Sequence, residues 1–117
     1  MKRILIAMAA LAVLAPAALA HTTLESTLPA SGSVLTQSPA QITLTFGEPT
    51  RLTSVAVATS SGERRLEFSP SGSAETFTVV SPDLAAGRNE VRWRALSRDG
   101  HPVEGAIIIV VRTPAQH

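Results

Sequence analysis

The stretch QITLTFGE, residues 41–48, alternates apolar and polar side chains with a period of two residues. Ile42, Leu44 and Phe46 fall on one face and the intervening threonines on the other, which is typical of a β-strand that buries one face. The same spacing recurs farther along the chain at Val55 and Val57, at Phe77 and Val79, and at Val91, Trp93 and Ala95. This repeated pattern restricts most of the chain to sheet structure.

Turn-forming sequences separate the alternating runs. SPSGSAE, SPDLAAGRN and RDGHPVEG are rich in Pro, Gly and Ser, and such stretches return at intervals of roughly 8–12 residues. No segment of helical period exceeds one or two turns, although residues 82–86 could form a brief helix. The pattern predicts an all-β domain, either a small Greek-key β-barrel or an immunoglobulin-like sandwich.

Three positions refine this expectation. The run GAIIIVV, residues 105–111, is almost continuously apolar, which predicts a strand buried on both faces or one that closes a barrel. Pro49 cannot donate a ladder hydrogen bond and is expected to end the strand before it. Trp93 is expected to fill the core from a central strand, because Arg92 and Arg94 alternate to the opposite face; a surface for stacking on a ligand is the alternative.

The first twenty residues have the pattern of a secretory signal peptide. Lys2 and Arg3 give a basic start, residues 4–15 are almost entirely apolar, and residues 18–20 form the small-x-small site that signal peptidase reads. The apolar run is shorter than the roughly 20 residues that a membrane span needs. An uncleaved anchor is therefore the less favoured alternative.

Cleavage after Ala20 would leave residues 21–117 as one exported, periplasmic domain that begins with His21. A free N-terminal histidine offers its α-amine and a ring nitrogen to the same metal ion, and both groups release their protons near neutral pH. Before cleavage the same nitrogen belongs to a peptide bond and has no lone pair to offer. The alternative is that a histidine merely follows the cut.

The composition of the processed chain restricts its partners. Removing Lys2 and Arg3 from the ten basic residues leaves eight arginines against nine acidic residues, so neither a nucleic acid nor an anionic membrane is indicated as a partner. The chain has no cysteine, and both methionines, Met1 and Met8, lie in the leader. Thiolate and thioether metal sites are thereby excluded, and any metal must be held by nitrogen and oxygen.

Two acidic residues and one histidine are further candidates. In RDGHP, Asp99 and His101 are two residues apart, so in an extended segment both side chains would lie on one face; a plain hairpin turn with an exposed histidine is the alternative. Glu48 stands at a strand end just before Pro49, where a carboxylate is usually a solvated cap. It becomes a candidate ligand only if this strand end lies near the N-terminus. His117, the last residue, is expected to take no part.

Taken in order, the stretches HTTLESTLPASGSVL, PAQITLTFGEP and LAAGRNEVRWRALSRDGHPVEGAIIIVV resemble the CopC family of periplasmic copper-binding proteins. The resemblance covers essentially all of residues 21–117. It implies a Greek-key β-barrel that holds one Cu(II) ion at one end.

The resemblance also implies a ligand set. His21 would supply its α-amine and ring nitrogen, His101 a second imidazole, and Asp99 a carboxylate oxygen. Glu48 matches an acidic residue of the family and would be a weak ligand or a hydrogen-bond partner of a ligand. Amine, imidazole and carboxylate without thiolate suit Cu(II) on chemical grounds as well. Thr22 departs from the proline that many members have after the first histidine.

The function expected from these features is non-catalytic: the protein would sequester Cu(II) or deliver it to a membrane partner, such as a CopD-like copper transport protein of the inner membrane. One alternative is an enzyme of the lytic polysaccharide monooxygenase type, which also uses a terminal histidine to hold copper. That class commonly has exposed aromatic residues, and this chain contains only three Phe and one Trp. The other alternative is a metal-free β-sandwich accessory module.

Overall fold

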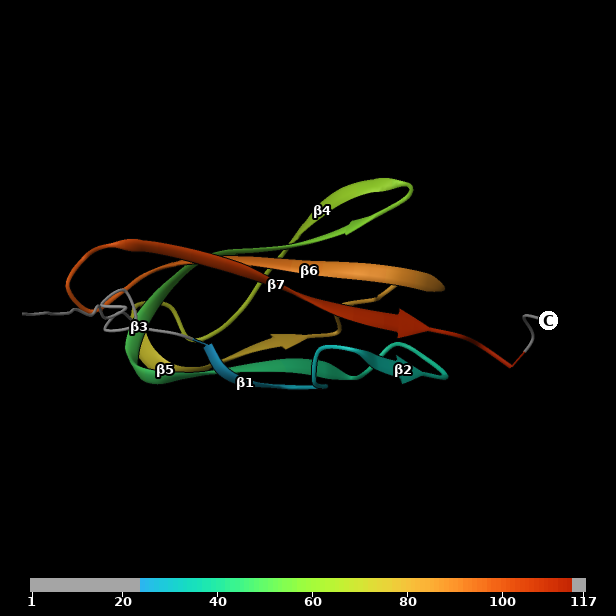
Figure 1. The fold of residues 1–117 in the computed structure, drawn as a ribbon, viewed down its shortest axis with the longest axis horizontal. Helices are drawn as coiled ribbons and strands as arrows, with labels where there is room; N and C mark the ends of the chain where they lie inside the picture. Colours follow the sequence, from blue (N-terminus) through green and yellow to red (C-terminus); the bar gives the residue numbers. More distant parts are fainter. Residues whose placement is uncertain (1–23, 115–117) are drawn as a thin grey trace, which may run out of the picture.

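The computed structural model describes residues 24–114 as a seven-stranded all-β fold without a helix (Figure 1). His21 and His117 therefore lie outside the described residues. The strands, in chain order, are β1 (Leu24–Leu28), β2 (Ser33–Leu35), β3 (Gln41–Thr59), β4 (Gly62–Leu66), β5 (Ser73–Val80), β6 (Gly87–Leu96) and β7 (Pro102–Val111). Nothing in this part of the chain is a helix long and apolar enough to span a bilayer.

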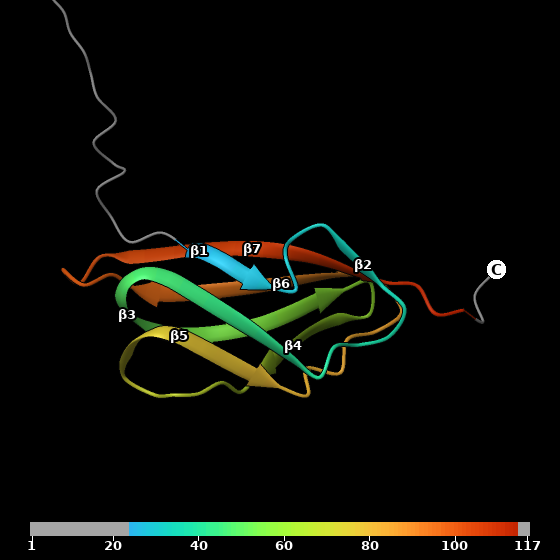
Figure 2. The same cartoon turned by 90° about the horizontal axis from the view of Figure 1, so that it is seen from below.

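The long strand β3 belongs to both layers of the fold. Its first half pairs antiparallel with β1 and β5, whereas its second half pairs antiparallel with β4 and β6. Strand β7 pairs antiparallel with β6, and β2 pairs in parallel with the end of β7. Figure 2 shows how the curved β3 passes from one layer to the other, so that the sheet curls on itself as expected for a small barrel or sandwich.

The crossing point is a bend at residues 47–49, which we call the β3 bend. Pairing with β5 stops at Thr45 and resumes at Thr50, while the strand itself continues through Pro49. The expectation that Pro49 ends the strand was therefore wrong. Proline is tolerated in a strand where the ladder is interrupted, and Pro49 lies within the gap in the pairing with β5.

The alternating residues identified in the sequence form the core. All of the inward positions are at most 5% exposed: Ile42, Leu44, Phe46, Val55, Val57, Phe77, Val79, Val91, Trp93 and Ala95. Ile107, Ile109 and Val111 join them from β7, whose other face is only half-covered. Burial of each large side chain contributes about 1.5–3 kcal/mol, so the predicted strand faces account for most of the packing.

Trp93 lies inside the core, as the alternation predicted. Its indole packs edge-to-face on Phe46, with ring centroids 5.3 Å apart and an interplanar angle of 79°. Gly105 stands opposite Trp93 in the β6–β7 ladder, and a Cβ there would lie 2.7 Å from the ring. Glycine is thus required at this position because the indole occupies the space of its side chain.

Candidate metal centre

Three segments meet at one end of the fold. The loop between β6 and β7, residues 97–101, follows the last rung of that ladder, Leu96 with Pro102. The β3 bend lies at the same end, and so does the start of β1, because Leu24 pairs with Phe46 just before the bend (Figures 1 and 2). Side chains from loops that are distant in sequence can therefore converge here.

The β6–β7 loop is a tight turn closed by its own backbone. Ser97 N–H donates to His101 O at 2.8 Å, and Gly100 N–H donates to Ser97 O at 2.8 Å. Gly100 has φ of +87°, a conformation that side-chain-bearing residues rarely adopt. The Asp-Gly step of the sequence is what allows the chain to reverse within so few residues.

The buried hydroxyl of Ser97 connects Asp99 to His101. Ser97 is 5% exposed; its Oγ donates to Asp99 Oδ1 and accepts the His101 N–H at 3.1 Å. The other carboxylate oxygen, Asp99 Oδ2, lies 3.1 Å from His101 Nδ1. The turn thus brings together the two side chains that their spacing had singled out, although the segment between them is not extended.

These contacts also set the charge of the carboxylate. The hydrogen bond from Ser97 and, after it, the interaction with His101 lower the pKa of Asp99 from 3.8 to about 2. Asp99 is therefore ionised at any physiological pH. Its side chain is 59% exposed and that of His101 is 61% exposed, so a carboxylate oxygen and an imidazole face solvent side by side.

Glu48 reaches this loop through Arg98. Arg98 Nη1 lies 3.9 Å from Glu48 Oε1, and the Glu48 side chain is 35% exposed. This contact joins the β3 bend to the β6–β7 loop, although an exposed ion pair contributes only about 0–1 kcal/mol. The structure consequently places Glu48 at the same end of the fold as Asp99 and His101. The strand-end hypothesis concerned the N-terminal residue His21, which lies outside the described residues.

Sequence reasoning missed two residues of this end, Ser97 and Arg98. A serine two residues before an aspartate is a recognisable turn signal, since its hydroxyl can bind nearby side-chain and backbone groups. The role of Arg98 has no such local signal, because Glu48 lies on another strand. Within residues 24–114 the structure contains no group of three or more His, Cys, Asp or Glu side chains that could hold a metal ion. Asp99 and His101 thus provide one oxygen and one nitrogen donor, chemistry that fits Cu(II) but leaves the set incomplete.

Comparisons with known proteins agree with this architecture. The family model described as CopC domain matches residues 24–112. CopC from Methylosinus trichosporium OB3b is 26% identical with a TM-score of 0.69, covering 83% of this chain and 99% of that protein. PcoC, a methionine-rich copper resistance protein from Escherichia coli, is 26% identical with a TM-score of 0.58, covering 79% and 99%. No curated protein sequence matches the chain significantly.

Proposed function

The chain belongs to the CopC family, and on this premise we propose that it is a non-catalytic periplasmic protein that binds one Cu(II) ion. The site is the end of the fold that carries Asp99 and His101. The observation that carries the proposal is the pair itself: a carboxylate ionised down to about pH 2 lies 3.1 Å from an imidazole, and both face solvent. Carboxylate and imidazole are donors that Cu(II) accepts readily, and no thiolate competes with them.

The remaining donors of the proposed site come from His21. After cleavage behind Ala20, its α-amine and ring nitrogen would add two nitrogens to that of His101. Three residues of chain reach at most about 10 Å, which keeps His21 near Leu24, and Leu24 pairs with Phe46 beside the β3 bend. This position of β1 supports a site shared between the new N-terminus and the β6–β7 loop.

For Glu48 we propose the role of a hydrogen-bond partner at the rim of the site, with weak ligation as the alternative. Its contact with Arg98 at 3.9 Å supports this role, because a carboxylate engaged by a guanidinium is a weaker donor to a metal. Arg98 then forms a weak contact between the β3 bend and the loop that carries the proposed ligands.

Binding is preferred to catalysis on the position of the aromatic residues. Phe46, Phe77 and Trp93 are buried in the core, and Phe68 packs against it. A copper enzyme acting on a polysaccharide surface commonly needs exposed rings beside the metal. The sequence contains no Phe, Tyr or Trp besides these four residues. The proposed role is to sequester copper or to deliver it to a membrane partner such as a CopD-like transport protein.

The test compares two forms of the protein, one beginning at His21 and one with a single alanine before it. Calorimetric titration with Cu(II), in the presence of a weak competing chelator, should give one ion per chain for the first form. The added residue converts the amine into an amide, so affinity should fall at least about a hundredfold while folding is unchanged. Equal affinities would remove the α-amine from the ligand set, and no saturable binding in either form would reject the function.

A further inference from the structure

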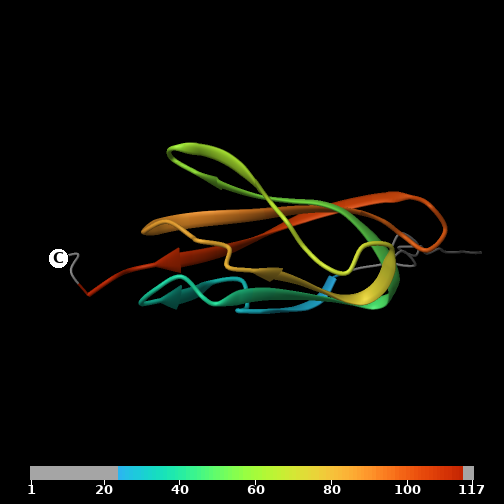
Figure 3. The same cartoon turned by 180° about the vertical axis from the view of Figure 1, so that it is seen from behind.

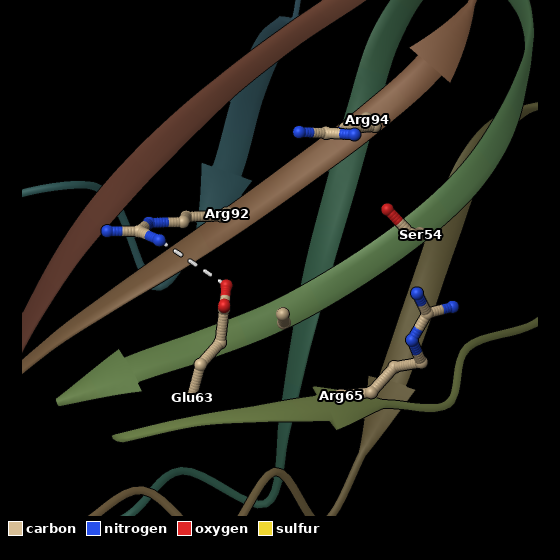
Figure 4. Close-up of a pocket in the computed structure, with 6 residues that line it drawn as sticks. Ser54, Glu63, Arg65, Arg92 and Arg94 are labelled. Carbon is tan, nitrogen blue, oxygen red and sulfur yellow. Dashed lines mark hydrogen bonds and ion pairs between the residues drawn. The ribbon is translucent and has the colours of Figure 1, made fainter. Parts of the chain in front are cut away.

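The outer face of β3, β4 and β6 is hollowed between two rows of charged side chains. The hollow has a volume of about 470 Å³ and is lined by Ser54, Ala56, Glu63, Arg65, Arg92 and Arg94. We call it the arginine groove (Figure 4). Strand β3 forms its floor, and β4 and β6 carry its two walls.

The strand register explains the shape of the groove. Ala56 lies opposite Arg65 of β4 on one side and opposite Arg92 of β6 on the other, and Ser54 lies opposite Arg94. Neighbouring strands are about 4.8 Å apart, so long side chains on both sides rise above a floor of small ones. The hairpin formed by the end of β3 and β4 projects from the body of the fold (Figure 3).

At one end of the groove the walls are already bridged by an ion pair. Glu63 Oε2 of β4 lies 3.4 Å from Arg92 Nη1 of β6, drawn as a dashed line in Figure 4. Glu90 Oε2 contacts the Nε of the same arginine at 3.5 Å. Glu90 and, more weakly, Glu63 raise the pKa of Arg92 above its ordinary value. Arg92 thus already forms ion pairs with two carboxylates of the protein itself.

The other end, around Ser54, has cations without a bridging carboxylate. The Arg65 guanidinium makes no ion pair or hydrogen bond with any residue in the described range 24–114, and the Ser54 hydroxyl makes none there either. Arg94 Nε lies 3.3 Å from a carboxylate oxygen of Glu104 on β7. Strand β7 borders β6 on the side opposite to β3 and the groove. In Figure 4 Arg65 and Arg94 stand on opposite sides of Ser54.

We propose that this end of the groove binds a carboxylate from an extended acidic segment of a partner protein. The carboxylate would bridge Arg65 and Arg94 above Ser54, as Glu63 bridges the two walls to Arg92. The small floor residues Ser54 and Ala56 allow an extended backbone to approach closely. The proposal concerns a different face from the copper site and does not depend on copper binding.

A protein segment fits the charges better than a free ion or a membrane. Each exposed ion pair contributes about 0–1 kcal/mol, so a single small carboxylate would bind weakly, whereas several carboxylates on one segment act together. Glu63, Glu90 and Glu104 lie on the same face, and they would repel a uniformly anionic lipid surface. The alternation of cations and anions favours a segment with carboxylates at intervals.

The experiment is fluorescence anisotropy of a fluorescein-labelled peptide of alternating glutamate and glycine at low ionic strength, with metal-free protein. We expect saturable binding that weakens as salt is added. The Arg65→Gln/Arg94→Gln double variant should bind about tenfold more weakly. The matched control is Arg51→Gln/Arg112→Gln, which removes the same charge outside the groove and should change binding less than about twofold. Circular dichroism verifies that both variants are folded.

Three outcomes would overturn the proposal. Equal weakening in the two double variants would show attraction by net charge alone, and absence of saturable binding to the unmodified protein would show that the groove takes no acidic segment. Vesicles of phosphatidylcholine and phosphatidylglycerol form the third arm. Binding of these vesicles with the same dependence on Arg65 and Arg94 would assign the groove to a membrane surface instead.

Discussion

The two ends of β6 carry polar groups of opposite character. Near its start, Asn89 is fully buried; its Oδ1 accepts the Ala85 N–H at 3.0 Å, and its Nδ2 lies 2.8 Å, 3.1 Å and 3.3 Å from the carbonyl oxygens of Ala85, Gly87 and Ile109. Just beyond its end, Ser97 is also buried but binds Asp99, whose side chain is largely exposed. The Asn89 amide makes all of these hydrogen bonds with backbone groups, whereas the Ser97 hydroxyl donates to a carboxylate that faces solvent.

This difference separates scaffold from site. The hydrogen bonds of Asn89 link the loop of residues 81–86 to β7. Arg64 adds two hydrogen bonds of 2.9 Å to Pro82 O and Asp83 O of the same loop. That loop is irregular and contains no helix, so the brief helix considered for residues 82–86 is wrong. Side chains that bind the backbone stabilise the fold. The Ser97 hydroxyl instead orients the exposed Asp99 carboxylate, which lies beside the exposed His101 imidazole.

The largest effect is expected at the scaffold end. Asn89→Ala leaves several buried backbone groups without a partner, so the free energy of unfolding should fall by about 3 kcal/mol, while the copper affinity of the folded protein stays unchanged. Urea denaturation measures the first quantity and titration the second. Thr53→Ala, which removes a 3.0 Å hydrogen bond from an exposed side chain to Arg94 O, should cost less than about 1 kcal/mol. A similar cost for both variants would erase the distinction between the two ends.

The reverse result is expected for His101→Ala. Removing a proposed nitrogen ligand should reduce Cu(II) affinity about a hundredfold, whereas the exposed side chain contributes little to unfolding. Competitive titration against a chelator of known affinity gives the first value. His117→Ala serves as the control histidine and should leave affinity unchanged. A stability loss at His101 as large as that at Asn89 would mean that the loop is scaffold as well.

Ser97→Ala tests the difference between the two ends of β6 because it removes the hydroxyl that binds Asp99 and the His101 N–H, while every proposed ligand remains. We expect Cu(II) affinity to fall about tenfold through loss of orientation. In the metal-free protein the pKa of Asp99 should rise from about 2 toward 3.8, measured by NMR titration of its carboxyl. Ser61→Ala, in the turn before β4, is the matched control and should change neither quantity.

The lowered pKa of Asp99 also predicts a pH window. A carboxylate whose folded pKa lies below its unfolded value stabilises the protein above about pH 4, and this contribution disappears as pH falls through about 2. Ser97→Ala should therefore show less loss of stability than the unmodified protein between these values. An identical acid profile for both would indicate that Ser97 does not control this carboxylate.

The smallest effect is expected for Arg98→Ala. Its contact with Glu48 is long and exposed, so Cu(II) affinity should fall only about twofold and unfolding should change by less than about 0.5 kcal/mol. Arg88→Ala provides a control on the same strand pair. A loss as large as that of His101→Ala would show that Arg98 and Glu48 belong to the ligand-holding machinery and not to its rim.

Sequence alone predicted the parts of this molecule that depend on local pattern. Strand faces such as Ile42, Leu44 and Phe46 follow from period-two alternation. The expectation that Asp99 and His101 lie close together assumed an extended segment, whereas in the structure a turn brings them together. The strand β4 escaped prediction because only Leu66 of its five residues is buried, which leaves no alternation to detect. Pro49 was misjudged because a bend within one strand and the end of a strand have the same local signal.

The contacts that hold the proposed site together depend on tertiary structure. The Arg98–Glu48 pair joins the β6–β7 loop to the β3 bend, which lie close together because the end of β6 pairs with β3 just after the bend. The link from Ser97 to both Asp99 and His101 depends on the conformation of the whole turn. Residue types and spacing thus indicated which side chains to propose as ligands, and the fold was needed to find the residues that contact them.

The most direct test of the account is electron paramagnetic resonance of the protein that begins at His21, loaded with one equivalent of Cu(II). Nitrogen hyperfine structure should correspond to three nitrogen ligands, and His101→Ala should reduce this number to two. A spectrum of the unmodified protein without histidine nitrogens, or one that His101→Ala leaves unchanged, would contradict the proposal that copper is held at this end of the fold.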